Sequence, residues 1–571
     1  MNWRSSYQRW EQYENLDPNL RTQLLKLQDD PKTLADCFLG NLEFGTGGMR
    51  GEMGPGTNRV NLYTIRKASE GLSRYVKASG DWAIEAGVVI AYDSRHHSAE
   101  FAREAAQVIG HHGIRVYLFE QLCPTPLLSF AVRYFQAFGG IVITASHNPP
   151  EYNGFKVYGP DGGQITPQPA KQLMTKVNEV DDELKVGFTD LQTLKQQGCL
   201  QLIGSEVMEA YLEQLHSMRI QPVVDQITIV FSPLHGTTLE PIRNGLQRFG
   251  YQHVFVVPEQ SNPDPNFSTV TSPNPEDPAA FQLAIQYGKA HKADLILTTD
   301  PDGDRLGVAA RQENGEYLVL NGNQIGVLLL SYWLSMKQSQ DQLPKESIVL
   351  KTIVTSEMGR EIAASFGIQT IDTLTGFKYI GEKATEFEQT GSRVFLFGYE
   401  ESNGYLLYDF VRDKDAIQAA LVMADVCSYC HSQGKSVWEA LQSLYERYGY
   451  YQEALYSITL KGAEGTKKIT DILSALRENP LNQLMGKKAV LLEDYLTKER
   501  TNLLTQEVTP LSLPESNLLK YWLEDESWFC IRPSGTEPKL KIYFGVKGNS
   551  SEDSQERLSR LQDAVIRLIH Q

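Results

Sequence analysis

The chain has 571 residues, of which 41% are hydrophobic and 22% charged, and a formal net charge of −16 at pH 7. A chain this long exceeds a single hydrophobic core, so we expect several domains of a globular protein. The negative charge argues against binding to a nucleic-acid backbone, although basic residues gathered at one site would still accept a small anionic substrate.

The sequence predicts no membrane partner. The first twenty residues lack the apolar core of a signal peptide, and the most apolar window, 325–334, is too short to cross a bilayer. Six cysteines in so long a chain do not indicate a disulfide framework, which favours a reducing cytoplasm. Cys427, Cys430 and His431 have the spacing of a haem attachment motif, but an ordinary amphipathic helix explains them better.

Strand-like and helix-like segments alternate along most of the chain. Segments 86–93, 114–120 and 139–146 are typical of strands, with helical segments at 98–113 and 124–139 between them. This order predicts a parallel sheet covered on both faces, with ligands at the carboxyl ends of its strands.

The same layout of an apolar strand and a polar, glycine-containing loop recurs further along the chain. After residue 448 the sequence pattern changes to a mixture of helix-like segments, strand-like segments and polar connecting segments. We therefore predict an α/β protein of four domains. The predicted boundaries are 1–204, 205–320, 321–448 and 449–571.

The segment T-T-D-P-D-G-D-R is the sharpest chemical signal. Asp300, Asp302 and Asp304 alternate on a loop directly after an apolar strand, where three carboxylates repel one another unless a cation neutralises them. Oxygen ligands favour magnesium, calcium or manganese, and the spacing does not fit a calcium-binding EF-hand. Arg305, beside the three aspartates, indicates that an anion also binds there.

A second loop follows the strand that ends near residue 146. It carries Ser146 and His147, with Lys156 further on, but it lacks the Gly-x-Ser-x-Gly elbow of serine hydrolases. A serine oxygen, a lysine and a divalent cation together suit phosphoryl transfer, because the cation offsets charge on the transferred group and the lysine pairs with phosphate or moves a proton.

Three further loops are candidates for substrate binding. The segment G-T-G-G-M-R-G holds Thr46 and Arg50, and it is a weak signal by itself. Arg532, Ser534, Gly535 and Thr536 combine a guanidinium, two hydroxyls and a flexible backbone, which suits a free phosphate. Glu400 and Ser402 are two positions apart and suit sugar hydroxyls, while Arg412 and Lys414 would meet a substrate anion.

The motifs T-A-S-H-N-P-P-x-x-N-G-x-K, T-D-P-D-G-D-R, G-x-E-E-S-x-G and R-x-S-G-T-E-P occur in that order. Together they resemble the α-D-phosphohexomutase superfamily over nearly the whole chain. The stretch around F-G-T-G-G-M-R-G is similar to the subgroup that holds bacterial α-phosphoglucomutases and the phosphopentomutase and glucose-1,6-bisphosphate synthase enzymes. The resemblance implies three related α/β domains and a C-terminal α+β domain around a central cleft.

The resemblance also implies roles for the candidate residues. Ser146 would carry phosphate and, with the three aspartates, bind Mg²⁺. His147 and Lys156 would be acid/base candidates, and Arg50 and Arg305 would lie near the phosphoserine. Thr375 and Gly376 would contact the sugar, and residues 532–536 would hold the phosphate that is not reacting.

The implied activity is the interconversion of glucose 1-phosphate and glucose 6-phosphate, with a small phosphosugar as substrate and glucose 1,6-bisphosphate as intermediate and activator. Alternatives are a glucose-1,6-bisphosphate synthase that uses an acyl phosphate donor, a phosphopentomutase and a non-catalytic phosphosugar-binding protein. Phe377, at a position where relatives vary, leaves the choice of sugar open.

Overall fold

The computed structural model of the protein describes residues 3–42, 44–45, 48–220, 226–459, 462–533 and 539–570. The chain divides into two compact units, which are described separately. Unit 1 comprises Met1–Asn321, Phe377–Phe397 and Ser402–Val437. Unit 2 comprises Gly322–Gly376, Gly398–Glu401 and Trp438–Gln571.

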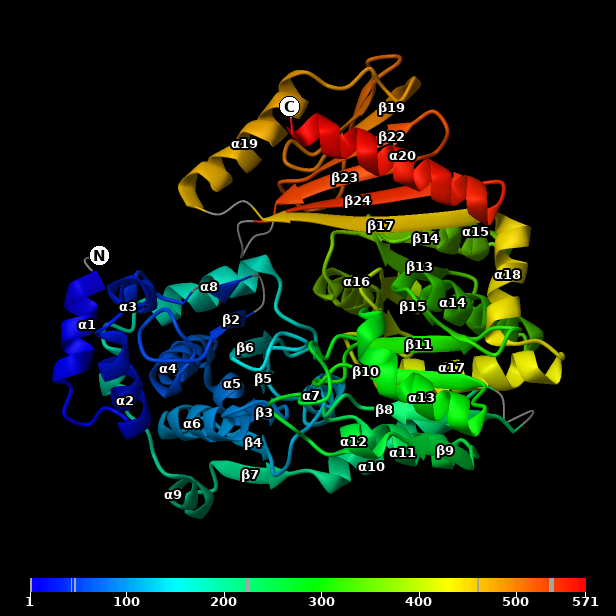
Figure 1. Ribbon diagram of the computed structural model, residues 1–571. Coiled ribbons are helices and arrows are strands. Elements are labelled where there is room, and N and C mark those ends of the chain that lie inside the picture. Colours follow the sequence, from blue (N-terminus) through cyan, green and yellow to red (C-terminus); the bar gives the residue numbers. More distant parts are fainter. Residues whose placement is uncertain are drawn as a thin grey trace. The chain divides into compact units, whose positions relative to one another are not determined.

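The first sheet of unit 1 has seven strands in the order β1-β2-β6-β5-β3-β4-β7 (Figure 1). The strands are β1 (Phe44–Gly45), β2 (Gly48–Glu52), β3 (Val88–Tyr92), β4 (Val116–Phe119), β5 (Gly139–Ile143), β6 (Tyr152–Tyr158) and β7 (Leu200–Ile203). The predicted parallel arrangement is confirmed, because β3 pairs in parallel with both β4 and β5. β5 is buried throughout, as expected for a parallel strand covered on both faces.

β6 returns antiparallel to β5, and β2 pairs antiparallel with β6. In this register Gly48 lies opposite Lys156 and Arg50 lies opposite Gly154. The strand that carries Arg50 therefore runs beside the strand that carries Lys156, a proximity that the separation of the two residues in sequence does not suggest.

Helices surround this sheet and form an N-terminal lead before it. They are α1 (Trp3–Gln12), α2 (Pro18–Leu27), α3 (Pro31–Phe38), α4 (Leu62–Ala78), α5 (Asp81–Ala86), α6 (Ser98–His111), α7 (Thr125–Tyr134), α8 (Pro167–Asn178), α9 (Leu191–Gln196) and α10 (Ser205–Ser217). Asp17 and Asp30 accept hydrogen bonds from the first turns of α2 and α3, each with proline at its first position, which explains where these helices begin.

The second sheet of unit 1 has five strands in the order β12-β11-β10-β8-β9. They are β8 (Thr228–Ser232), β9 (His253–Val256), β10 (Leu295–Thr299), β11 (Leu306–Arg311) and β12 (Tyr317–Leu320). β8 pairs in parallel with β9 and β10, whereas β10 and β11 form an antiparallel hairpin whose loop contains the three aspartates.

The remaining elements of unit 1 follow. They are α11 (Leu239–Arg248), α12 (Pro258–Ser261), α13 (Gln282–His291), α16 (Phe377–Thr390), β16 (Gly404–Leu406) and α17 (Ala416–Ser432). Cys427 and Cys430 lie within α17 as free cysteines, which confirms the helical interpretation of that segment.

Unit 2 begins with α14 (Gly322–Ser339), β13 (Ser347–Thr352), α15 (Met358–Ser365), β14 (Gln369–Thr373) and the end of β15 (Val394–Glu400). β13 and β14 pair in parallel.

The rest of unit 2 contains an eight-stranded sheet. Seven of its strands have the order β17-β24-β23-β22-β19-β20-β21, and the eighth, β18, pairs with β19. Its elements are α18 (Val437–Tyr448), β17 (Tyr450–Thr459), α19 (Gly462–Glu478), β18 (Gln483–Leu484), β19 (Lys487–Asp494), β20 (Glu499–Asn502), β21 (Val508–Pro510), β22 (Leu519–Leu523), β23 (Trp528–Pro533), β24 (Lys539–Gly548) and α20 (Ser551–His570).

Figure 1 shows α20 lying along this C-terminal sheet. Leu558, Leu561 and Val565 of α20 belong to one hydrophobic cluster with residues of the sheet. The mixture of helices and mainly antiparallel strands is the α+β domain expected for this region. Among the residues that the structure describes, we find no helix with the length and apolar character that crossing a membrane requires.

Candidate active site

Ser146 lies just past the carboxyl end of β5, in an unusual backbone conformation. Its φ is +53°, in the left-handed region that non-glycine residues seldom adopt, and the residue is 2% exposed. Its amide donates a hydrogen bond to Thr144 Oγ1 at 2.9 Å. Such strain persists only where the surroundings hold it, and it is common at catalytic positions.

The side chain of Ser146 faces the acidic loop of the second sheet. Ser146 Oγ donates a hydrogen bond to Asp300 Oδ2 at 2.8 Å and lies 3.2 Å from His147 Nδ1. Burial, reinforced by the cations of Arg305 and Arg50, lowers the pKa of His147 well below its ordinary value. The imidazole is therefore neutral at neutral pH and lies beside the serine oxygen.

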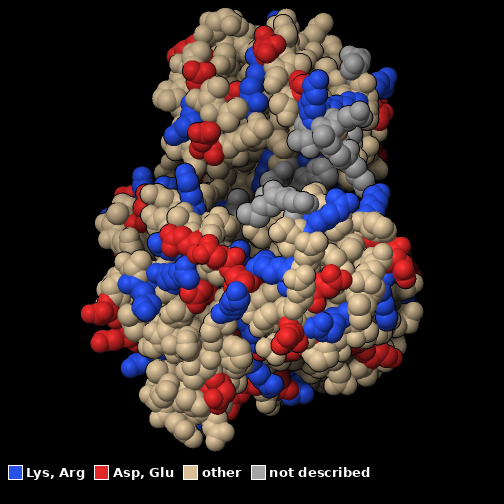
Figure 2. All heavy atoms as spheres, turned by 90° about the vertical axis from the view of Figure 1, so that its left-hand side faces the viewer, with Lys and Arg blue, Asp and Glu red and all other residues tan. Residues whose placement is uncertain are grey.

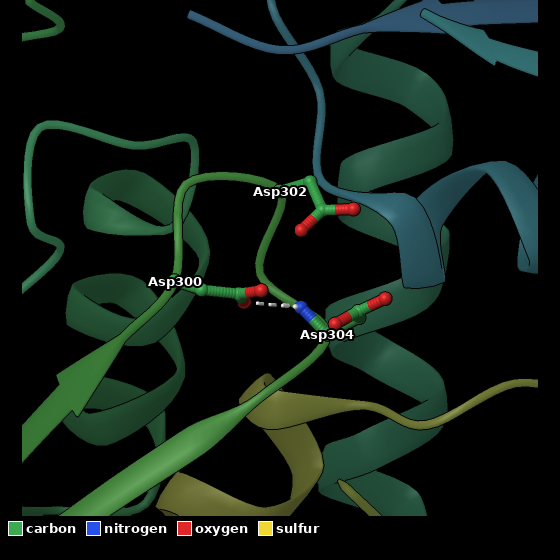
Figure 3. Close-up of side chains that lie close together, drawn as sticks. All are labelled: Asp300, Asp302 and Asp304. Atoms are coloured by element: carbon green, nitrogen blue, oxygen red, sulfur yellow. Dashed lines mark hydrogen bonds between the residues drawn. The ribbon is translucent and has the colours of Figure 1, made fainter. Parts of the chain in front are cut away.

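The three aspartates form one buried group in the β10–β11 hairpin (Figure 3). One carboxylate oxygen of each lies within 4.8 Å of the others, and the residues are at most 1% exposed. The loop is folded over Asp300, whose Oδ1 accepts hydrogen bonds from the amides of Asp304 at 3.1 Å and Arg305 at 3.0 Å. Gly303, with a φ of +69°, supplies the tight turn that this folding requires.

The donor set fits a divalent cation. Asp302 Oδ1 and Asp304 Oδ1 are buried, and neither accepts a hydrogen bond from the described part of the chain. Buried carboxylate oxygens without partners are costly, and a hard cation is the ligand that would satisfy several of them at once. Burial raises the pKa of Asp300 well above its ordinary value, and the negative charges of Asp302 and Asp304 raise it further.

Two lysines contact the aspartates. Lys156 Nζ, from β6, lies 2.6 Å from Asp302 Oδ2 and 3.2 Å from Asp304 Oδ2, and Lys414 Nζ lies 2.9 Å from Asp304 Oδ2. Although burial opposes ionisation, Lys414 and Lys156 hold the pKa of Asp304 below its usual range. Burial likewise disfavours the charged lysine, but Asp302 and Asp304 outweigh it and raise the pKa of Lys156, so this lysine is protonated at neutral pH.

The two arginines predicted near the serine differ in their contacts. Arg50 is exposed, and its Nη1 donates to Asn148 Oδ1 at 2.9 Å, within the loop that carries Ser146. Arg305 forms an ion pair with Glu276, and its Nε lies 3.9 Å from Asp304 Oδ1. Arg50 thus contacts the loop of the serine, and Arg305 lies beside the aspartates that the serine faces.

Sequence reasoning missed three residues of this site. Thr125 Oγ1 donates to Asp302 Oδ2 at 3.0 Å, and Asp93 and Arg95 contact the loop that carries Ser146. All three follow the strands β3 and β4, so the rule that ligands gather at the carboxyl ends of parallel strands would have found them.

The other predicted residues are divided between the two units. Unit 2 contains Thr375, Gly376, Glu400 and Arg532, and unit 1 contains Ser402. Glu400 is buried at the end of β15, and Arg532 lies in β23. Gly376 has a φ of +112°, a conformation that favours glycine. Thr46, Ser534, Gly535 and Thr536 lie outside the described residues.

Arg412 has internal partners. Its side chain is fully buried, its Nη2 is paired with Glu388 Oε2, and its Nε donates to Thr385 Oγ1 at 3.1 Å. Both partners lie on α16, so Arg412 joins the loop before α17 to that helix. Arg412 and Lys414 were both predicted to meet a substrate anion, and Lys414 is the one that contacts the acidic loop, at Asp304.

The charged side chains on the surface are arranged differently from those near Ser146. On the face drawn in Figure 2, Lys and Arg side chains are interspersed with Asp and Glu. The basic groups around Ser146, by contrast, are gathered within a few ångströms of the acidic loop.

Four family models match the chain in succession. They describe the α/β/α domains I, II and III and the C-terminal domain of phosphoglucomutase/phosphomannomutase, and they match residues 41–184, 209–315, 321–448 and 481–568.

Full-length relatives and solved structures are similar to the chain over most of its length. A Staphylococcus aureus protein named phosphoglucomutase is 38% identical over 527 residues, which covers 92% of this chain and 93% of the relative. The fold is similar to that of a putative phosphomannomutase from Thermus thermophilus, with a TM-score of 0.67, 21% identity and coverage of 93% and 100% of the two chains. The open form of parafusin from Paramecium has a TM-score of 0.66, 16% identity and coverage of 93% and 95%.

Proposed function

Because the chain belongs to the phosphoglucomutase/phosphomannomutase family, we propose that it interconverts glucose 1-phosphate and glucose 6-phosphate and carries the transferred phosphoryl group on Ser146. The observation that carries this proposal is the hydrogen bond from Ser146 Oγ to Asp300, in a buried acidic group that also holds Lys156. A serine oxygen beside a cation site and a buried ammonium is suited to accepting and releasing a phosphoryl group.

We assign Mg²⁺ to Asp300, Asp302 and Asp304 together with the phosphate on Ser146, because Asp302 Oδ1 and Asp304 Oδ1 are buried and accept no hydrogen bond from the described residues. When bound, the ion would stabilise the negative charge that develops on the transferred group. Lys156 and Arg305 would supply further positive charge around that group, since Lys156 is held protonated by the aspartates.

In the first transfer, a free hydroxyl of the sugar monophosphate attacks the phosphorus of phosphoserine. The bond between phosphorus and Ser146 Oγ breaks while a bond between phosphorus and the sugar oxygen forms. His147, which is neutral and adjacent to Ser146 Oγ, is suited to take the hydroxyl proton and deliver it to the departing serine oxygen. The products are glucose 1,6-bisphosphate and free Ser146.

In the second transfer, the other phosphate of the bisphosphate returns to Ser146 by the reverse of these steps. The sugar must turn over between the transfers, so a second site must hold whichever phosphate is not reacting. We assign this site to Arg532 and the Ser534–Thr536 segment, with Arg50 and Lys414 as further anion contacts. Glu400, Ser402, Thr375 and Gly376 are our candidates for contacts to the sugar.

The relative's name favours glucose over the alternative substrates, because the match at 38% identity covers nearly all of both chains. The described cysteines are all free, in keeping with a cytoplasmic location, which we propose for the enzyme.

The test is a coupled assay that measures glucose 6-phosphate formed from glucose 1-phosphate, with Mg²⁺ and catalytic glucose 1,6-bisphosphate present. Ser146→Ala should lose activity by orders of magnitude, whereas Ser5→Ala, at an exposed serine, should retain it. Mass spectrometry of the active protein should find phosphate on the peptide that contains Ser146. Full activity of a folded Ser146→Ala protein would disprove the proposal.

A further inference from the structure

Arg95 makes an unusual set of contacts with the loop that carries Ser146. Its side chain is completely buried, directly after β3. Nη1 donates to the carbonyl oxygens of Pro149 at 2.8 Å and Tyr152 at 3.1 Å, and Nη2 donates to those of Ser146 at 2.6 Å and Asn148. A single guanidinium thus binds four backbone carbonyls within residues 146–152.

Three of these carbonyls, those of Ser146, Asn148 and Pro149, lie in the loop between β5 and β6, and the fourth belongs to Tyr152 at the start of β6. Ser146 is buried, and a buried backbone carbonyl without a donor is costly. Lysine could not replace the contacts, because its single ammonium lacks the planar, forked donors that reach several carbonyls at once.

Arg95 is also connected to the backbone amide of Ser146, through Asp93 and Thr144. Its Nε lies 3.3 Å from Asp93 Oδ2, and the same carboxylate oxygen accepts a hydrogen bond from Thr144 Oγ1 at 2.6 Å. Thr144 Oγ1 in turn accepts the hydrogen bond from the Ser146 amide. Both the carbonyl and the amide of Ser146 are therefore bound within one network that contains Arg95.

The guanidinium also contacts the loop at 262–270. Arg95 Cζ lies 5.0 Å from the ring centroid of Phe267, a residue that is 1% exposed and has a φ of +50°. Beside it, His96 Nε2 lies 2.8 Å from Asn266 Oδ1. The position of Arg95 is thus set by the sheet that bears Ser146 and by the loop at 262–270.

We propose that Arg95 is a positioning residue for phosphoryl transfer: it holds Ser146 in its left-handed conformation so that Oγ faces Asp300. The inference rests on the proposed function, because it needs Ser146 to be the carrier. Positioning matters here because a displacement of about 1 Å at a reacting atom costs roughly 100-fold in rate.

The variant Arg95→Lys tests the proposal, because it keeps the positive charge beside Asp93 and removes the fork of donors. The matched control is Arg66→Lys, since Arg66 is also largely buried, pairs with Glu104 at 2.7 Å and lies 4.3 Å from the Phe188 ring. Each protein is phosphorylated on Ser146 and mixed with glucose 1-phosphate in a rapid-quench apparatus, and the loss of phosphoserine is followed by mass spectrometry.

We expect Arg95→Lys to lower the rate of transfer, and kcat, by roughly 100-fold while KM changes by less than about threefold, because the substrate contacts remain. The ³¹P chemical shift of the phosphoserine should also move, which a residue that contributes only to stability would not cause in a folded protein. Arg66→Lys should transfer phosphate at the parental rate.

Transfer at the parental rate in folded Arg95→Lys, with an unmoved ³¹P shift, would overturn the role of Arg95 alone. Absence of transfer in the parent would overturn the proposed function and this role with it. If Arg95→Lys does not fold, the isosteric variant Asp93→Asn is tested in its place, because it weakens the ion pair with Arg95 and keeps the guanidinium. A folded Asp93→Asn protein should show a lowered kcat with KM retained, and parental kcat would overturn the proposal.

Discussion

Ser146 Oγ donates a hydrogen bond to Asp300 Oδ2 at 2.8 Å, although 154 positions separate the two residues in the chain. The serine follows β5 of the first sheet, and the aspartate follows β10 of the second. The carboxyl ends of two strands from different sheets therefore meet at one point, which places a potential phosphate carrier against a buried group of carboxylates suited to a cation. Two predictions concern this site, and two concern buried side chains elsewhere in the chain.

Removal of divalent cations is expected to abolish activity and to lower the midpoint of thermal unfolding, because Lys156 and Lys414 then offset only part of the charge of the three buried carboxylates. Dialysis against a chelator followed by titration with Mg²⁺, with activity and the unfolding midpoint both recorded, measures this. Asp302→Asn should need more Mg²⁺ than the parent for half-maximal activity, whereas the exposed Asp81→Asn should behave as the parent does. Full activity in excess chelator would contradict the assignment of a metal site.

Lys156→Met should destabilise the protein by about 3–5 kcal/mol, because it removes the ion-pair partner of buried Asp302 and one of the two lysines that contact buried Asp304. Mg²⁺ should restore part of this loss by neutralising the same carboxylates. Chemical denaturation with and without Mg²⁺ measures both effects. Lys176→Met, at a surface pair with Glu179, should change stability by less than about 1 kcal/mol, and an equal loss in both variants would refute the argument.

Glu453 should make stability depend on pH. Burial raises the pKa of this β17 carboxyl to about 7, and Asn323 Nδ2 donates to its Oε2 at 3.1 Å. The folded protein therefore holds a proton on Glu453 that the unfolded chain releases near pH 4.5. The stability associated with this proton is fully present below about pH 4.5 and is lost as the pH rises to about 7, above which the loss levels off.

Glu453→Gln should remove this dependence, since the amide does not ionise. Thermal unfolding of the parent and the variant across pH 4.5 to 8 measures it as the difference between their midpoints. That difference should shift in favour of the variant as the pH rises and become constant above about pH 7. A difference that does not change with pH would show that Glu453 titrates normally.

Trp10→Ala should destabilise the protein without altering the chemistry. Trp10 is completely buried, its Nε1 donates to Glu183 Oε1 at 2.6 Å, and its ring contacts those of Phe38 and Tyr63. Its truncation should cost about 3–5 kcal/mol of stability, because α1 loses its main contact with the first α/β domain. At a temperature where the variant is folded, kcat should equal that of the parent. A selective loss of kcat would instead connect the N-terminal helices with catalysis.

Much of the site was predictable because its signals are local. A buried apolar run followed by Asp300, Asp302 and Asp304 indicates a strand that ends in a cation-binding loop, and a similar run before Ser146 places that serine at a strand end. The alternation of strands and helices likewise predicts parallel pairing, which β3, β4 and β5 confirm. These patterns depend only on residues close together in the chain.

The contacts between loops could not be predicted in the same way. Lys156 reaches Asp302 because β6 folds back beside β5, and Lys414 reaches Asp304 from the loop before α17. Arg412 and Lys414 look equivalent in the sequence, yet Arg412 is paired with Glu388 on α16, and Lys414 with the aspartates.

The sequence by itself thus determined the kinds of strand and helix, the chemical groups of the site and the strand ends on which Ser146 and the aspartates lie. Only the tertiary structure decided which cation pairs with which carboxylate, and that Arg95 binds the carbonyls of the loop around Ser146. The physical reason is that strand formation follows from local hydrophobic periodicity, whereas the partner of a buried charge depends on how distant segments pack to exclude water.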